Sequence, residues 1–164
     1  MDEFASRKYP IQEHIAFQRR TWVVERIGWV ALVVIVLAAL LGLFGGGPLS
    51  RQTAGSDEMK VQYDRFQRVT KLASFTFLFA PAANAERRLH LNREFQDAFE
   101  ITGIFPTPLQ SAFDDGGLGM TFSTEANKES QIVIWAHPRR YGSINIDARA
   151  DDGSGFNFRV FVYP

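Results

Sequence analysis

Three histidines are the first candidates for catalysis or metal binding. They are His14, His90 and His137, and no two of them have a metal-ligand spacing such as i, i+4 on a helix. We interpret all three as surface histidines. The chain contains no cysteine, which excludes disulfides, thiolate metal sites and a cysteine nucleophile.

Two Asp-Asp-Gly clusters, 114–117 and 151–153, offer carboxylate oxygens that calcium prefers. A calcium loop supplies about six to eight oxygen ligands at ordered positions, and each cluster supplies two carboxylates. Aspartate and glycine are also the residues that hairpin turns require. We therefore predict two turns and no metal site.

No motif for catalysis or cofactor binding is present. Ser123 and Ser130 lack the context of a nucleophilic serine, and the chain has neither a G-x-G-x-x-G nor a P-loop sequence. Formal net charge is zero, so the composition does not indicate a nucleic-acid partner. The sequence predicts a protein that is not an enzyme and has no cofactor and no evident small-molecule substrate.

Residues 27–44 read IGWVALVVIVLAALLGLF, a run without charge that is long enough for a transmembrane helix. Trp22 and Trp29 lie near its start, where interfacial aromatic rings are favoured, and glycines followed by Pro48 end it. A cleaved signal peptide is the alternative, but its apolar region would be shorter and nearer the N-terminus. A buried soluble helix would rarely be apolar on every face. We predict an uncleaved anchor.

Basic residues flank this span unequally. Only Arg51 and Lys60 follow it closely, and more basic residues precede it: Arg7, Lys8, Arg19, Arg20 and Arg26. Because such an excess marks the cytoplasmic side, we expect an inner-membrane protein with its N-terminus in the cytoplasm and a periplasmic or otherwise extracytoplasmic C-terminal domain. The basic arm, 1–26, should be partly helical. It lies on anionic lipid or, alternatively, docks a cytoplasmic partner.

Small residues form a seam along the span. Gly28, Ala31, Ala38 and Gly42 recur at i, i+3, i+10 and i+14. Small residues let helices approach closely in lipid, so this face predicts lateral packing against an integral membrane protein. The alternative is that glycine and alanine are simply common in membrane helices.

Residues 45–59 are rich in glycine and serine and predict a linker, and 60–164 predict a β domain. Apolar residues alternate with polar ones in short runs between turn signals, and one helical turn is expected over 93–98. The eight predicted strands are 60–70, 72–79, 87–92, 99–105, 118–124, 131–136, 142–150 and 156–163. This spacing predicts a mainly β fold, an antiparallel β-sandwich.

At the level of the fold, this pattern resembles an immunoglobulin-type sandwich. The cysteine pair of true immunoglobulin domains is absent, and Trp135 is a candidate core tryptophan. Such a resemblance implies an architecture and assigns no function.

One apolar, proline-bearing run, 101–109, is a candidate partner contact if it is exposed. If it is buried, it plugs the end of the core, which we favour. The candidate contact residues are Ile101, Ile104, Phe105, Pro106 and Pro108. The basic pairs at 87–88 and 139–140 could contact lipid headgroups or an acidic partner, but such pairs are usually solvated surface.

These features favour an accessory or structural subunit of a larger integral membrane complex. Its helix would lie in the bilayer and pack against the partner, and its β domain would brace the extracytoplasmic face. The alternative is a membrane-anchored module that binds a ligand or a protein, for which a concave polar and aromatic site is expected.

Overall fold

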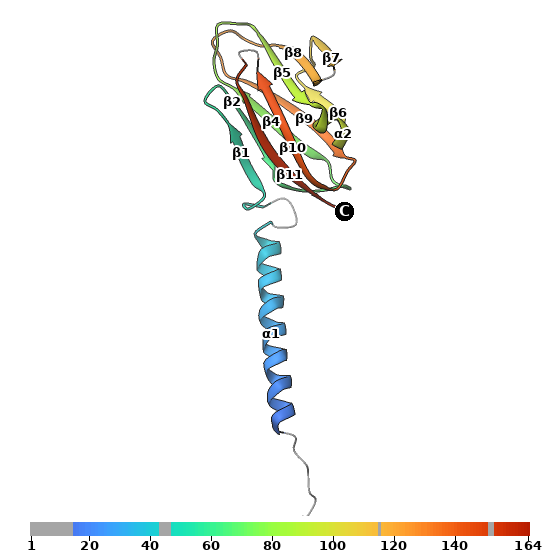
Figure 1. The fold of residues 1–164 in the computed structure, drawn as a ribbon. Helices are drawn as coiled ribbons and strands as arrows, with labels where there is room; N and C mark the ends of the chain where they lie inside the picture. The colour runs from blue at the N-terminus through green and yellow to red at the C-terminus, as the bar shows by residue number, and fades with distance from the viewer. Residues whose placement is uncertain (1–14, 43–46, 115, 151–152) are drawn as a thin grey trace, which may run out of the picture. The chain divides into compact units, whose positions relative to one another are not determined.

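The computed structural model describes residues 15–42, 47–114, 116–150 and 153–164 (Figure 1). Expectations for residues 1–14, for 43–46 and for Asp115, Asp151 and Asp152 therefore lie outside the described residues. By its internal contacts the chain divides into two compact units, with the boundary between Leu37 and Ala38.

Helix α1, Ile15–Leu40, joins the expected helical arm and the apolar run into one element. Residues 15–26 contain neither glycine nor proline, so nothing interrupts the helix before the apolar run begins. Its segment Arg19–Leu40 is long and apolar enough to cross a membrane, and none of its most apolar window is buried.

The predicted small-residue seam needs a correction at Gly42. The helix ends at Leu40, and Gly42 has φ +91°, the left-handed conformation in which glycine commonly ends helices. Its N–H donates to Ala39 O at 3.0 Å. Gly42 therefore lies outside the helix, and the predicted packing face within α1 consists of Gly28, Ala31 and Ala38. That this face packs against a partner stays a prediction.

Eleven strands in the described residues form two packed sheets, which confirms the predicted mainly β, two-sheet fold (Figure 1). The first sheet has the order β1-β2-β4-β9-β6, and the second has the order β3-β11-β10-β5-β8-β7. The strand bounds are β1 Arg51–Gly55, β2 Met59–Asp64, β3 Phe66–Arg68, β4 Ala73–Phe79, β5 Glu86–Asn92, β6 Phe99–Phe105, β7 Gln110–Asp114, β8 Gly117–Ser123, β9 Ser130–Pro138, β10 Gly142–Ala150 and β11 Gly155–Tyr163.

Three edge strands differ from the expectations. β1 lies within the segment predicted to be a linker, and β7 lies where no strand was predicted. The run predicted as one strand over 60–70 is divided at Arg65, where the chain passes from the first sheet to the second. The chain continues in the same direction from β2 into β3. β3 then pairs in parallel with β11, so the sandwich is not wholly antiparallel.

The core is formed by side chains that alternate between buried and outward positions along the strands. In β4 the side chains of Ala73, Phe75, Phe77 and Phe79 are buried, and the residues between them face outward. Phe75 is fully buried and meets Phe95 and Phe99 edge-on, with ring centroids 5.4 and 5.2 Å apart. These contacts join β4 to α2 and to the start of β6.

Helix α2, Arg93–Ala98, confirms the helical turn predicted over the same residues. Asn92 caps it, because its Oδ1 accepts from Phe95 N at 3.2 Å while its Nδ2 donates to Asn145 O at 3.1 Å. Glu94 Oε1 accepts from Asn145 N at 3.2 Å. The two hydrogen bonds to Asn145, from Asn92 Nδ2 and to Glu94 Oε1, join the start of α2 to β10.

Candidate protein-contact surface

The outer face of the first sheet carries Phe105, the one aromatic residue of the predicted contact run. Phe105 is 64% exposed at the end of β6 and is the register partner of Val133 in β9. Trp135 lies two residues further along β9 and is half-buried. Register partners in antiparallel strands point to the same side, so Phe105, Val133 and Trp135 form one surface, here called the aromatic patch.

A β-bulge in β6 sets which side chains reach this surface. The register shifts between Ile101 and Gly103, and Thr102 Oγ1 donates to Trp135 O at 3.2 Å. The extra residue reverses the alternation. Ile101 and Ile104 therefore both pair with buried residues of β9 and pack against the core, whereas Phe105 points outward.

Trp135 is not a core residue, contrary to expectation. It lies between buried Ile134 and Ala136, and strand alternation places it on the opposite side of the sheet. Its partner across the strands is Gly103, and a Cβ at that position would lie 3.2 Å from Trp135 Cε3. The absence of a side chain at Gly103 thus lets the indole ring lie close against β6.

A shallow polar groove continues the same face toward β1. It has a volume of about 370 Å³ and is bounded by β1, β2 and β4. Thr76 of this groove is the register partner of Val133, so the groove adjoins the aromatic patch. The groove residues are Arg51, Gln52, Thr53, Gln62, Tyr63, Asp64, Ser74 and Thr76. An apolar centre with a polar margin is the usual anatomy of a protein interface.

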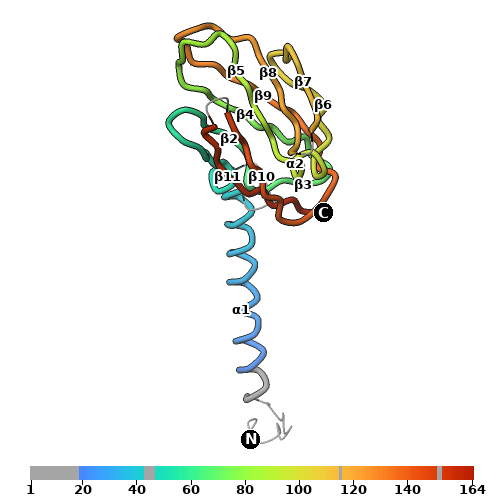
Figure 2. Tube along the Cα trace, turned by 45° about the horizontal axis from the view of Figure 1, so that its top comes forward, coloured from blue at the N-terminus to red at the C-terminus, as the bar shows by residue number. Residues whose placement is uncertain are grey.

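Strand β7 extends the exposed apolar surface at the margin of the sandwich, where it lies beside β6 in both views (Figure 1 and Figure 2). Leu109 is 58% exposed and Phe113 is 67% exposed. Phe113 pairs with the buried Leu118 and so points to the inner side of its sheet. Phe113 stays exposed because β7 is an edge strand of the six-stranded sheet. The first sheet has five strands, one fewer, and does not cover this edge.

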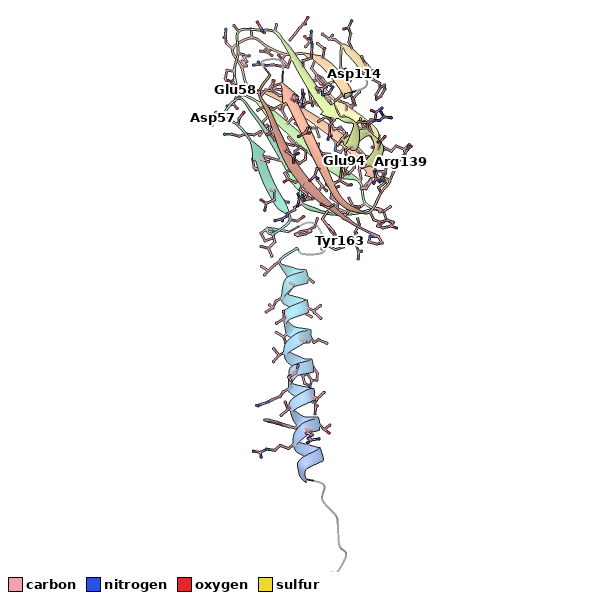
Figure 3. The ribbon with its side chains drawn as sticks, in the orientation of Figure 1. Asp57, Glu58, Glu94, Asp114, Arg139 and Tyr163 are labelled. Atoms are coloured by element: carbon pink, nitrogen blue, oxygen red, sulfur yellow. The ribbon has the colours of Figure 1, made fainter. Side chains whose placement is uncertain are left out.

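The carboxylate of Asp114 serves the turn between β7 and β8 (Figure 3). Its Oδ1 accepts from Gly116 N at 2.8 Å and from Gly117 N at 2.9 Å, and it lies 3.5 Å from His90 Nε2. The hydrogen bond from Gly116, followed by the one from His90, lowers the pKa of the Asp114 carboxyl. Among the described residues, no group of three His, Asp or Glu side chains could hold a metal ion.

A cavity of about 310 Å³ lies at the end of the sandwich where Glu58 is labelled in Figure 3. Arg87 lines it and donates from Nη2 to Ala80 O at 2.6 Å. Arg87 Nε is buried and makes no hydrogen bond to any described residue. A small anionic group is the chemistry that such a nitrogen would bind.

The structure separates the five residues predicted as a partner contact. Phe105 is exposed on the outer face, Ile101 and Ile104 pack against the core, and Pro106 and Pro108 are half-buried in the connection from β6 to β7. The expected buried plug is therefore wrong for Phe105. Leu109 belongs to the predicted run 101–109 and is exposed, and Trp135, a candidate core residue from its sequence, is half-buried on the outer face. Phe113 and Val133 are exposed or half-buried apolar residues that no sequence pattern had indicated as contacts.

No family model and no curated protein matches this chain. Among solved structures, the cohesin module of a Clostridium perfringens family 33 glycoside hydrolase is similar, with a TM-score of 0.50 and 13% identity over 68% of this chain and 98% of that module.

Two further solved structures match less well. The CARDB domain of a Pyrococcus furiosus protein, in complex with di-metal ions, has a TM-score of 0.42 and 13% identity over 68% of this chain and 93% of that one. The sulfur carrier protein SoxY from Chlorobium limicola has a TM-score of 0.41 and 8% identity over 82% and 99%. At these identities, what the likeness to the cohesin module shows is the β-sandwich fold alone.

Proposed function

We propose that this chain is a membrane-anchored, non-catalytic accessory subunit whose β-sandwich binds a partner protein on the far side of the membrane. The aromatic patch carries the proposal. Phe105 is 64% exposed on a sheet face whose neighbouring positions are half-buried Val133 and Trp135. Aromatic residues are enriched at protein interfaces, where they form the central anchors.

Helix α1 supports the anchoring part of the proposal. The most apolar 18-residue window of its segment Arg19–Leu40 has a mean hydropathy of 2.3, and none of that window is buried. A helix that is apolar on every face is stable in lipid and not in water. The charge asymmetry across the span supports a position of the sandwich outside the cytoplasm.

The partner is best described as the extracytoplasmic part of an integral membrane protein. The patch is a flat sheet surface with a shallow polar groove, a shape that fits another protein better than an enclosed small molecule. An anchor keeps the sandwich close to other proteins of the same membrane, which raises the effective concentration of such a partner.

Site-specific photo-crosslinking tests the proposal. A photoreactive phenylalanine analogue at Phe105 should crosslink the full chain, in its native membrane, to one membrane protein. The same analogue at Asn157, which is exposed on the second sheet, is the matched control. Crosslinks of equal yield from both positions, or none from Phe105, would contradict the proposed surface.

A second candidate function, binding of a small anionic ligand, rests on the cavity beside Arg87. Its volume lies at the lower end of the range of ligand pockets, about 300–1,000 Å³. Small carboxylates that raise the melting temperature of the native chain, but not that of Arg87→Leu, would support it. Unchanged melting temperatures across a carboxylate panel would eliminate it.

A further inference from the structure

The end of the sandwich reached first by the chain after α1 is rich in basic and aromatic residues. It consists of the β2–β4 segment 65–72 and the β9–β10 connection 139–142, which lie near each other because β4 pairs with β9. Neither segment contains Asp or Glu. Their basic residues, here called the basic end, are Arg65, Arg68, Lys71, Arg139 and Arg140. Arg139 is paired with Glu100 of β6, its Nη2 lying 3.2 Å from Oε2, and no described residue forms an ion pair with the other four.

Exposed apolar and aromatic side chains accompany these charges. Tyr141 is 75% exposed, Leu72 is 45% exposed and Phe161, near the end of β11, is 40% exposed. Tyr163, labelled in Figure 3, is the register partner of Arg68. Basic residues mixed with tyrosine and phenylalanine are the composition that favours the headgroup region of a bilayer.

The chain is held to this end just after the helix. Leu49 N donates to Leu41 O at 3.1 Å, next to the last residue of α1. Ser50 is fully buried, and its hydroxyl donates to Phe66 O at 3.2 Å and accepts from Phe66 N at 3.3 Å. Phe66 lies in the segment 65–72, so the chain between α1 and β1 is hydrogen-bonded to the basic end.

We propose that the basic end rests on anionic lipid headgroups of the membrane that α1 spans. The inference depends on the anchoring part of the proposed function and extends it to a second, electrostatic contact. Phosphate groups are the complement of these arginines and lysines, and a negatively charged bilayer surface attracts basic segments that lie within a Debye length of it. Exposed Leu72 and Tyr141 supply the apolar component of the contact.

Hydrogen exchange of the full chain in nanodiscs tests this contact. Wild type is compared in phosphatidylcholine alone and in phosphatidylcholine with phosphatidylglycerol. Backbone amides of 65–72 and 139–142 should exchange about fivefold more slowly with the anionic lipid, and 0.5 M salt should remove the difference. The variant Lys71→Glu/Arg140→Glu should lose the effect, and the control Arg149→Glu, exposed near the opposite end of β10, should keep it.

The outcomes separate the two proposals. If the chain fails to enter nanodiscs and is extracted from membranes by alkali, the anchor is wrong and the lipid contact falls with it. If the chain is anchored but exchange is the same in both lipids, only the lipid contact is overturned. Protection that appears without anionic lipid and follows an added protein would also overturn it, since the basic end would then bind an acidic protein partner.

Discussion

Gly103 and Trp135 face each other across β6 and β9, and the indole ring occupies the space where any side chain at Gly103 would begin. A Cβ there would lie 3.2 Å from Trp135 Cε3, closer than ordinary van der Waals contact. This relationship positions the ring within the aromatic patch, diagonally across the strands from Phe105.

Gly103→Ala should therefore displace the indole ring and weaken partner binding about tenfold while the fold remains, because interface anchors tolerate little displacement. Tryptophan fluorescence and affinity for the crosslinked partner are the measurements. Gly119→Ala is the matched control, since its Cβ would meet its nearest neighbours at 3.8 and 3.9 Å. Equal affinities for the two variants would show that the position of Trp135 does not matter for binding.

Phe75→Ala should destabilise the sandwich by about 3–5 kcal/mol, the usual cost of removing a fully buried phenylalanine. The loss is large because Phe75 contacts Phe95, Phe99 and Phe158 at once. Denaturant unfolding measures the change. Phe105→Ala, on the surface, should stay within about 0.5 kcal/mol of wild type, and a comparable loss there would mean that Phe105 is part of the core.

Asn92→Ala should cost about 1 kcal/mol or more, because it removes the cap of α2 and the hydrogen bond to Asn145 O. Asn92→Asp keeps an acceptor for Phe95 N and loses the donor, so its stability should lie between those of the alanine variant and wild type. If Asn92→Asp and Asn92→Ala unfold at the same denaturant concentration, capping contributes nothing at this position.

The Asp114 carboxyl should make the free energy of unfolding depend on pH in the acidic range. Its pKa is lowered from the ordinary 3.8, so its contribution is full above that value and is lost as pH falls through the lower pKa of the folded state. Asp114→Asn should then be less stable than wild type at pH 7, with the difference shrinking below about pH 4. Melting curves between pH 2 and pH 7 that run parallel for the two proteins would contradict this.

Sequence alternation predicted the strands that have one buried face. β4 and β10 show it most clearly, since buried and outward residues alternate along their length, and both strands were expected near their observed bounds. β1 and β7 are edge strands with almost every side chain solvated, so their sequences carry no periodic apolar signal. β3 spans only Phe66–Arg68 and is defined by tertiary pairing with β11.

The candidate site was predicted only in part, because a β-bulge in β6 changes which side chains point outward. The run over 101–109 was recognised as apolar, but the bulge at Thr102 decides that Ile104 packs inward and Phe105 points outward. A bulge depends on the pairing with β9 and has no signature in β6 alone. Trp135 could have been placed correctly, because alternation with Ile134 and Ala136 already puts it on the other face.

The mass of the intact assembly tests the central claim most directly. The full chain, tagged at its C-terminus, is purified from its native membrane in a mild detergent and compared with Phe105→Ser. The account predicts that wild type runs in a larger complex with one stoichiometric membrane protein, and that Phe105→Ser, folded and still in the membrane, loses it. Wild type running alone at the mass of a single chain would contradict the account.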